Sequence, residues 1–160
     1  MNRNSALRHG AWALLLFCAA CAGIERGYPD RRYFVLDVPT QANPTNPAGS
    51  EVLRVSTIRV SPRYADRSFV YRTSESGFES DFYHQFLVPP AALMTEEIRK
   101  ALMASEMFKY VIDASSPMQA SLALDGSVNA LYGDFRNLDQ PRAVLEMEFF
   151  VTSEIATKPG

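Results

Sequence analysis

The longest regular pattern in this 160-residue chain lies near its C-terminal end. Apolar or small residues occupy seven successive even positions over Ala120–Tyr132, and a second run repeats the alternation on odd positions over Ala143–Val151. A period of two indicates a β-strand with one buried face. Two such runs joined by a short polar segment predict a long antiparallel hairpin, with Glu146 and Glu148 on its solvent face.

Shorter patterns upstream predict the rest of the domain. Aromatic and β-branched segments predict strands at 33–38, 52–60, 68–73, 78–88 and 108–112. A change of phase near Ser56 predicts a β-bulge within 52–60. Pro89 and Pro90 precede residues 91–105, whose apolar positions recur at helical spacing. We therefore expect an α+β fold: a mostly antiparallel sheet of about five or six strands, with 52–60, 68–73 and 78–88 as a meander and one helix packed on one face.

The first twenty residues carry the features of a bacterial signal peptide. A basic start with Arg3 and Arg8 is followed by a short apolar run over 11–20 and by small residues before a cysteine. The run is too short to span a bilayer, which needs about 20 apolar residues. Ala19, Ala20 and Cys21 resemble a lipobox, which predicts cleavage between Ala20 and Cys21 and lipidation of the cysteine. A plain cleaved signal with a free cysteine stays open as the alternative.

Cleavage would leave a mature chain with few specialised features. It divides the sequence into a signal peptide at 1–20, a lipidated N-terminus and short tether at 21–32, and a single periplasmic domain at 33–160. Removing Arg3 and Arg8 leaves 14 basic residues against 18 acidic ones, a net charge of −4. Nucleic acid is therefore not an expected partner, because phosphate binding needs a basic face. Cys21 is the only mature cysteine, so no internal disulfide can form.

The residue types that usually carry catalysis are scarce. His84 is the only histidine after position 20, and it lies among aromatic residues in a predicted strand, where a packed or surface role is more common. There is no serine elbow and no phosphate-binding glycine loop. Asp134, Asn137 and Asp139 have the wrong spacing for a calcium loop and are typical turn formers. We expect no catalytic residue, no metal site and no enzyme activity.

Several ordered segments together resemble the ABC-type transport auxiliary lipoprotein family. They are the lipobox, the segment 33–36, the segment 53–64 with its Ser-Pro-x-Tyr ending, the segment 69–72, the helix at 91–105 and the alternating run 122–128. The resemblance covers roughly Tyr33 to Val151. Phe86 stands where family members usually carry tryptophan. Members usually continue into another strand and a C-terminal helix, so the resemblance implies a domain that is incomplete at its C-terminus.

The resemblance implies a non-enzymatic auxiliary subunit of a phospholipid transport system between the inner and outer membranes. It implies two partners, a mammalian-cell-entry (MCE) domain protein and an ABC permease–ATPase complex; phospholipid and a homo-oligomer stay open. The expected location is the periplasmic face of the outer membrane, because Ala22 rather than aspartate follows the lipidated cysteine. No cofactor is expected beyond the covalent lipid on Cys21.

Four residues are candidates for a partner interface, since exposed aromatic and arginine side chains are typical of contact surfaces. They are Arg63, Tyr64, Tyr71 and Arg72. The alternative is sheet packing for Tyr71 and a solvated charge for Arg72. Two alternative functions also stay open. One is a periplasmic lipid carrier that holds an acyl chain on an uncovered sheet face, and the other is an assembly factor for an outer-membrane barrel.

Overall fold

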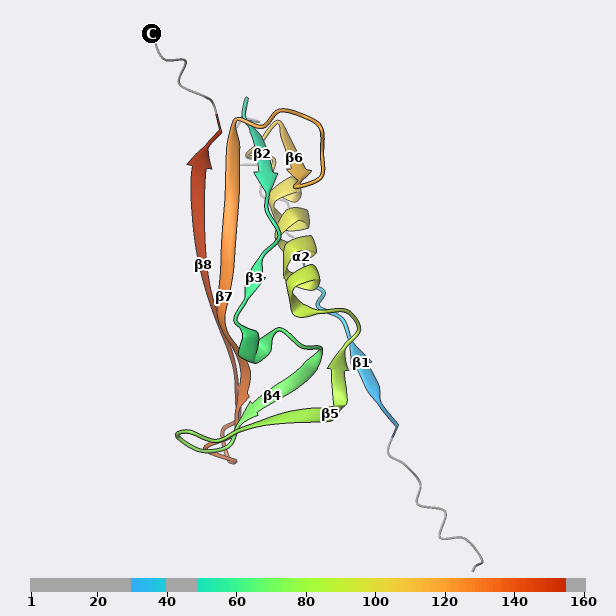
Figure 1. Cartoon of the computed structure of the whole chain (residues 1–160), viewed down its shortest axis with the longest axis vertical. Helices are drawn as coiled ribbons and strands as arrows, with labels where there is room; N and C mark the ends of the chain where they lie inside the picture. The colour runs from blue at the N-terminus through green and yellow to red at the C-terminus, as the bar shows by residue number, and fades with distance from the viewer. Residues whose placement is uncertain (1–29, 40–48, 155–160) are drawn as a thin grey trace, which may run out of the picture.

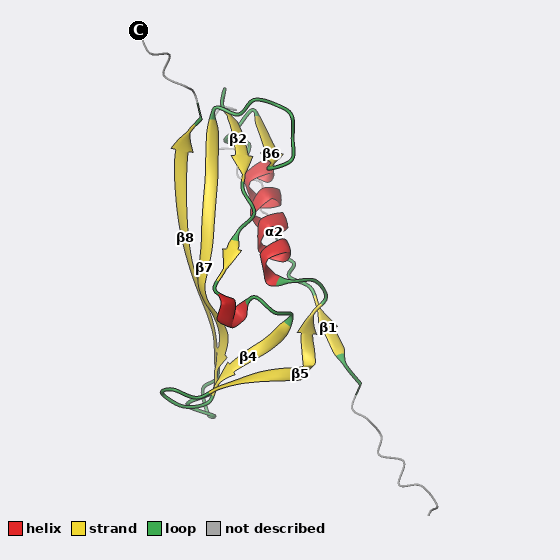
Figure 2. Ribbon diagram, viewed as in Figure 1, coloured by secondary structure: helices red, strands yellow, loops and turns green. Residues whose placement is uncertain are grey.

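The computed structural model describes residues 30–39 and 49–154, which form one eight-stranded mixed sheet with one α-helix (Figures 1 and 2). Ala20 and Cys21 lie outside the described residues, as does most of the tether. The strands are β1 (Arg32–Phe34), β2 (Val52–Val55), β3 (Arg59–Val60), β4 (Ser68–Arg72), β5 (Phe78–Phe86), β6 (Tyr110–Asp113), β7 (Leu122–Asp134) and β8 (Arg142–Ser153). The helix α2 spans Pro90–Ala104, and a 3-10 turn, η1, spans Pro62–Tyr64.

The predicted hairpin is present and dominates the molecule. β7 and β8 pair antiparallel over their whole length, from Leu122 opposite Ser153 to Asp134 opposite Arg142. Along its other edge, β7 pairs in succession with β2, β3 and β4. Figure 1 shows these three short strands following one another beside the long orange ribbon of β7. Three strands share one edge of β7 and β8 takes the other, so β7 pairs directly with four of the other seven strands.

The predicted fold class is wrong in strand number and direction. The sheet has eight strands, and β2, β3 and β4 all run parallel to β7. β1 runs parallel to β5, and β2 runs parallel to β6; only β4–β5 and β7–β8 are antiparallel. The predicted meander is absent because β2 and β4 pair with β7 rather than with each other. Neighbours in sequence usually pair, and here a long-range strand replaces them.

The phase change predicted near Ser56 splits one strand into two. Leu53 and Val55 are almost fully buried in β2, and Ile58 is equally buried just before β3. The Ser56 amide donates to the carbonyl of Leu124, 2.9 Å away, so the chain stays attached to β7 across the break. The Ile58 amide donates to the Thr95 hydroxyl of α2 at 2.9 Å. The helix therefore supplies the hydrogen bond that the sheet does not.

A bulge at Asn129 changes which side chains of β7 face inward. The register with β8 slips by one residue between Val128 and Ala130, which leaves Asn129 unpaired and exposed. Cross-strand partners share a face. Leu131 therefore stays with the core around Val128, whereas Tyr132 turns to the opposite face. The expected uniform alternation holds only as far as residue 128.

The core lies between α2 and the centre of the sheet. Met94 of α2 packs with Ile58 and Val128, while Ile98 and Leu102 pack on the buried residues of β2. The helix covers β2, β3 and β6 but does not extend over β8. Apolar residues of β8 consequently stay exposed, with Leu145 at 52%, Phe149 at 48% and Val151 at 61%. The predicted partial coverage of the sheet is found at β8.

Candidate functional site

A partly open apolar pocket of about 370 Å³ lies where β4 and β5 curl away from β7. Its walls come from β4, β5, β7, β8, the start of α2 and the segment after β1. Phe69 and Phe86 pack together on one side, with ring centroids 4.6 Å apart, and Leu131 and the half-exposed Leu145 form the opposite side. No charged residue and no histidine lines it. Its volume falls within the range of pockets that bind small ligands, and its lining suits an apolar one.

A sharp bend in β5 precedes Phe86, the residue of this strand that lines the pocket. The register against β4 jumps from Ser68 opposite Gln85 to Val70 opposite Ser80, so several residues of β5 bulge out. The Asp81 carboxylate fills this bulge. It accepts the backbone amides of Tyr83 and His84, at 2.7 and 3.0 Å. Figure 1 shows β5 turning through this bend before it reaches β1.

The Asp81 side chain also contacts the side chains of Tyr71 and His84. Its second oxygen accepts the Tyr71 hydroxyl at 3.0 Å and lies 2.7 Å from Nδ1 of His84. Burial alone would raise the pKa of Asp81, but the hydrogen bonds from His84, Tyr83 and Tyr71 outweigh it and lower the pKa to about 2. Burial and the bond to Asp81 raise the pKa of Tyr71 to about 12. Asp81 is therefore ionised and fixed at neutral pH.

Two of the four candidate interface residues lie in η1 and do not share one environment. Tyr64 is 5% exposed, and its ring stacks on that of Tyr132 with centroids 6.0 Å apart. Arg63 is exposed, and its guanidinium lies 5.0 Å from the centroid of the Phe78 ring, within the range of a cation–π contact. Tyr64 packs inside the domain and lines the pocket, while only Arg63 presents a charge to solvent.

The other two candidates lie next to each other in β4. Tyr71 is partly buried between Asp81 and the ring of Phe135, whose centroid is 5.1 Å away. The Arg72 guanidinium donates to the carbonyl oxygens of Ser74 and Glu75 and lies 5.7 Å from the centroid of the Phe78 ring. Tyr64 and Tyr71 thus line the pocket, whereas Arg63 and Arg72 do not and instead lie near the Phe78 ring. Their proposed role in binding a partner stays a prediction.

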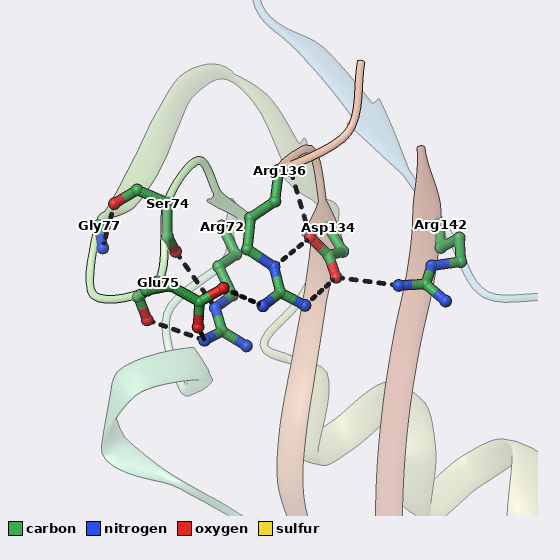
Figure 3. A network of polar contacts seen from close by, with 7 residues as sticks. All are labelled: Arg72, Ser74, Glu75, Gly77, Asp134, Arg136 and Arg142. Carbon is green, nitrogen blue, oxygen red and sulfur yellow. Dashed lines mark hydrogen bonds and ion pairs between the residues drawn. The ribbon is translucent and has the colours of Figure 1, made fainter. Parts of the chain in front are cut away.

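A network of ion pairs, drawn in Figure 3, connects the β4–β5 turn to the β7–β8 loop. Asp134 is 4% exposed and accepts the Nε and Nη2 groups of Arg136 at 3.0 and 2.8 Å, with Arg142 at 3.5 Å. Arg136 also contacts the Glu75 carboxylate at 2.8 Å, which joins the β7–β8 loop to the β4–β5 turn. The Arg136 side chain holds the pKa of Asp134 well below its usual range. The Asp134 side chain also accepts the Arg136 backbone amide at 3.2 Å, as expected of a turn former, but its ion pairs were not predicted from the sequence.

The remaining residues singled out from the sequence have structural positions. Asn137 does form a turn, since its side-chain oxygen accepts the Asp139 amide at 3.1 Å. Glu146 and Glu148 are exposed on β8, as expected for its solvent face. Within residues 30–39 and 49–154 no group of acidic, histidine or cysteine side chains has the arrangement of a metal site. In the same part of the chain, no helix is both long enough and apolar enough to cross a bilayer.

Comparisons with known proteins find solved structures with a similar fold but do not show a family for this chain. No family model and no curated protein matches the chain. The structure is similar to the crystal structure of protein XCC0632 from Xanthomonas campestris, described under the family model DUF330, with a TM-score of 0.70, 14% identity and coverage of 78% of this chain and 69% of that one. It is also similar to a solved uncharacterized protein, with a TM-score of 0.53, 16% identity and coverage of 82% and 84%.

These findings correct the family resemblance drawn from the sequence. The solved structure with the stronger similarity carries the DUF330 description, which is a different family from the ABC-type transport auxiliary lipoproteins. The short motifs that suggested the resemblance map onto ordinary elements of the sheet, since the segments 33–36, 69–72 and 122–128 lie in or beside β1, β4 and β7. Alternating apolar residues in such segments follow from strand burial alone and do not identify a family.

Proposed function

We propose that this chain is a non-enzymatic lipid-binding lipoprotein of the cell envelope, in which the pocket between β4, β5, β7 and β8 holds one acyl chain of a phospholipid. The lipid on Cys21 would anchor it to the periplasmic face of the outer membrane. In this role it would act as an auxiliary subunit of phospholipid transport between the two membranes.

The apolar pocket is the observation that supports this proposal. Its lining has no charged group, and one of its polar groups, the Tyr71 hydroxyl, is already bonded to Asp81. An acyl chain needs no hydrogen-bond partner, so such a lining favours it over a polar metabolite, whose buried polar groups would be unsatisfied. Leu145 at the wall is half exposed, so a chain could enter from that side.

The proposal keeps the two partners expected from the sequence, an MCE-domain protein and an ABC permease–ATPase complex. A phospholipid that moves between membranes needs a covered path through the periplasm and a source of energy, and neither is present in a single small domain. The candidate residues Arg63 and Arg72 are the proposed contacts, because both guanidinium groups lie near the Phe78 ring, at 5.0 and 5.7 Å from its centroid. Pull-down from native membranes tests this part, and an outer-membrane barrel as the main partner would replace it with the assembly-factor alternative.

Native mass spectrometry of the full chain released from detergent tests the acyl site. The wild-type protein should carry one non-covalent phospholipid in addition to its covalent anchor. Leu145→Lys should lower this occupancy at least about tenfold, because it places an ammonium group without a partner at an apolar wall. Since Leu145 is half exposed, the fold should change in stability by no more than about 0.5 kcal/mol.

Val151→Lys is the matched control for this experiment. Val151 lies on the same strand and is 61% exposed but does not line the pocket. It should leave phospholipid occupancy unchanged. A wild-type protein without bound lipid, or equal loss in both variants, would contradict an acyl site and favour a purely structural adaptor.

A further inference from the structure

A cluster of exposed aromatic, aliphatic and arginine side chains lies at the β1 edge of the sheet, apart from the pocket. We define the β1 edge patch as Arg31, Tyr33, Arg67, Phe82 and Leu87. All five are exposed, with Tyr33 at 48%, Phe82 at 52% and Leu87 at 50%. Surface hydrophobic residues are common singly, but a contiguous group of this kind marks an interaction site.

Specific contacts place each arginine of the patch beside an aromatic ring. The Arg31 guanidinium lies 3.9 Å from the centroid of the Phe82 ring, and that of Arg67 lies 5.9 Å from the centroid of the Tyr33 ring. Arg67 also donates to the carbonyl oxygen of Leu87 at 3.2 Å. Arg31 and Tyr33 are two residues apart in an extended segment, so their side chains point to the same face. The patch therefore places cationic groups beside apolar ones.

The charge of the patch is available to a partner outside the domain. Among the described residues, neither Arg31 nor Arg67 forms an ion pair. Asp30 and Asp66 adjoin them in sequence without meeting the distance of a salt bridge. Arginine above an aromatic ring combines an apolar base with a cationic head, which is the composition of protein surfaces at the boundary between lipid headgroups and acyl chains.

The position of the patch along the chain identifies this boundary as its partner. Eight residues lie between Cys21 and Asp30, where the described structure begins, so nine Cα–Cα steps join the two. Fully extended, they span about 30 Å at most. Under the proposed lipidation of Cys21, the anchor therefore holds β1 next to the bilayer, whereas β8 lies across the sheet from it. We infer that the β1 edge patch lies on the bilayer surface, with Tyr33, Phe82 and Leu87 at the headgroup level and both arginines paired with anionic lipid phosphates.

This inference rests on the proposed lipid anchor but adds an orientation that the anchor alone does not impose. A short tether alone would leave the domain free to rotate. Contacts by the patch would instead hold the β1–β5 end against the membrane. The pocket and its partners would then face the periplasm in one orientation.

The sequence offers a direct probe, because its single tryptophan, Trp12, lies in the signal peptide. Phe82→Trp gives the mature lipoprotein one tryptophan inside the patch. Phe149→Trp is the matched control, because the Phe149 side chain lies on β8, outside the patch, and is also about half exposed. Both proteins are placed in phosphatidylcholine vesicles with and without phosphatidylglycerol, and quenching by brominated lipids is measured. The Phe82→Trp emission should shift to the blue and be quenched at least about twofold more than that of Phe149→Trp.

Charge reversal tests the role of the arginines. Adding Arg31→Glu and Arg67→Glu to Phe82→Trp should remove the extra quenching in vesicles containing phosphatidylglycerol. Adding Arg59→Glu and Lys109→Glu changes the net charge equally at exposed positions outside the patch and should have no effect. Tyr33→Trp serves as a second probe site and should behave as Phe82→Trp does.

Three other outcomes would each contradict the inference. If the protein floats with the vesicles but both tryptophans are quenched equally, the patch does not contact lipid, although the anchor is intact. If Phe82→Trp is shifted to the blue without lipid quenching, a protein or a second copy of the chain covers the patch instead. If the protein does not float at all and its Cys21 thiol is unmodified, the proposed anchor itself is wrong.

Discussion

At the scale of single residues, Asp81 is the side chain that holds the bend in β5. One carboxylate satisfies two backbone amides that the bend in β5 removes from the sheet, and it also receives the Tyr71 hydroxyl. Sequence patterning gives no sign of this, because an aspartate at an alternating position is usually a solvent-facing strand residue. Asp81 therefore stabilises the bend that precedes the pocket residue Phe86.

Asp81→Asn should lower the free energy of unfolding by about 1–3 kcal/mol at pH 7, since the amide cannot replace a charged acceptor of several hydrogen bonds. The pKa of Asp81 is about 2 in the folded protein, below its ordinary value of 3.8. The carboxylate therefore stabilises the fold above about pH 4, and this stabilisation is lost as the pH falls toward 2. Urea unfolding followed by circular dichroism at several pH values measures the difference.

The wild-type protein and Asp81→Asn should accordingly converge in stability near pH 2. Asp139→Asn is the control, because the Asp139 side chain is exposed and accepts no hydrogen bond from another described residue. A constant difference between wild type and Asp81→Asn across this pH range would show that the ionised carboxylate is not the stabilising species.

At the scale of elements, the bulge in β7 decides which residues build the core and which build the pocket. The extra residue at Asn129 lets Val128 and Leu131 face the same side while Tyr132 turns toward Tyr64. Deleting Asn129 would restore strict alternation and move one half of β7 to the wrong face. We expect a loss of several kcal/mol, because each large apolar side chain removed from the interior costs about 1.5–3 kcal/mol.

Asn129→Ala keeps the extra residue and is the matched control. Asn129 is exposed, so this substitution should change the free energy of unfolding by about 0.5 kcal/mol or less. Thermal unfolding of the two variants measures the contrast. Equal stability of the deletion variant and the wild type would mean that the strand accommodates either register.

Local elements were largely predictable from the sequence, and their pairing was not. Helix α2 and the β7–β8 hairpin follow from residues close together in the chain, so a period of 3.6 or 2 was sufficient to find them. The parallel pairing of β2 and β4 with β7 depends on contacts between residues more than 60 positions apart, such as Leu53 with Leu122 and Tyr71 with Gly133. The pocket was missed for the same reason, because its walls come from strands that only the tertiary fold brings together.

At the scale of the whole molecule, the proposed location depends on the proposed lipidation of Cys21, which lies outside the described residues. Cys21→Ser removes the thiol that would carry the lipid and should deplete the protein from the outer-membrane fraction. Fractionation followed by immunoblotting measures this, and the variant should appear in the soluble periplasm or, uncleaved, at the inner membrane. Circular dichroism should be unchanged in the strand region, because the domain begins about ten residues later.

Phospholipid transport should fail in the Cys21→Ser strain although the domain folds. Full transport by a soluble protein would show that anchoring is dispensable. Mass analysis of the wild-type mature chain is the companion measurement, since an unmodified thiol would remove the basis for this expectation.

The central position of β7 also affects how the chain acquires its structure. The strands β2, β3 and β4 precede the strand with which they pair, since Leu53 must wait for Leu122, 69 residues later. Contacts of such separation slow folding, because the intervening loop must close before the sheet gains any pairing energy. The edges of the early strands stay unpaired during this interval, so the nascent polypeptide would benefit from a chaperone until β7 is available.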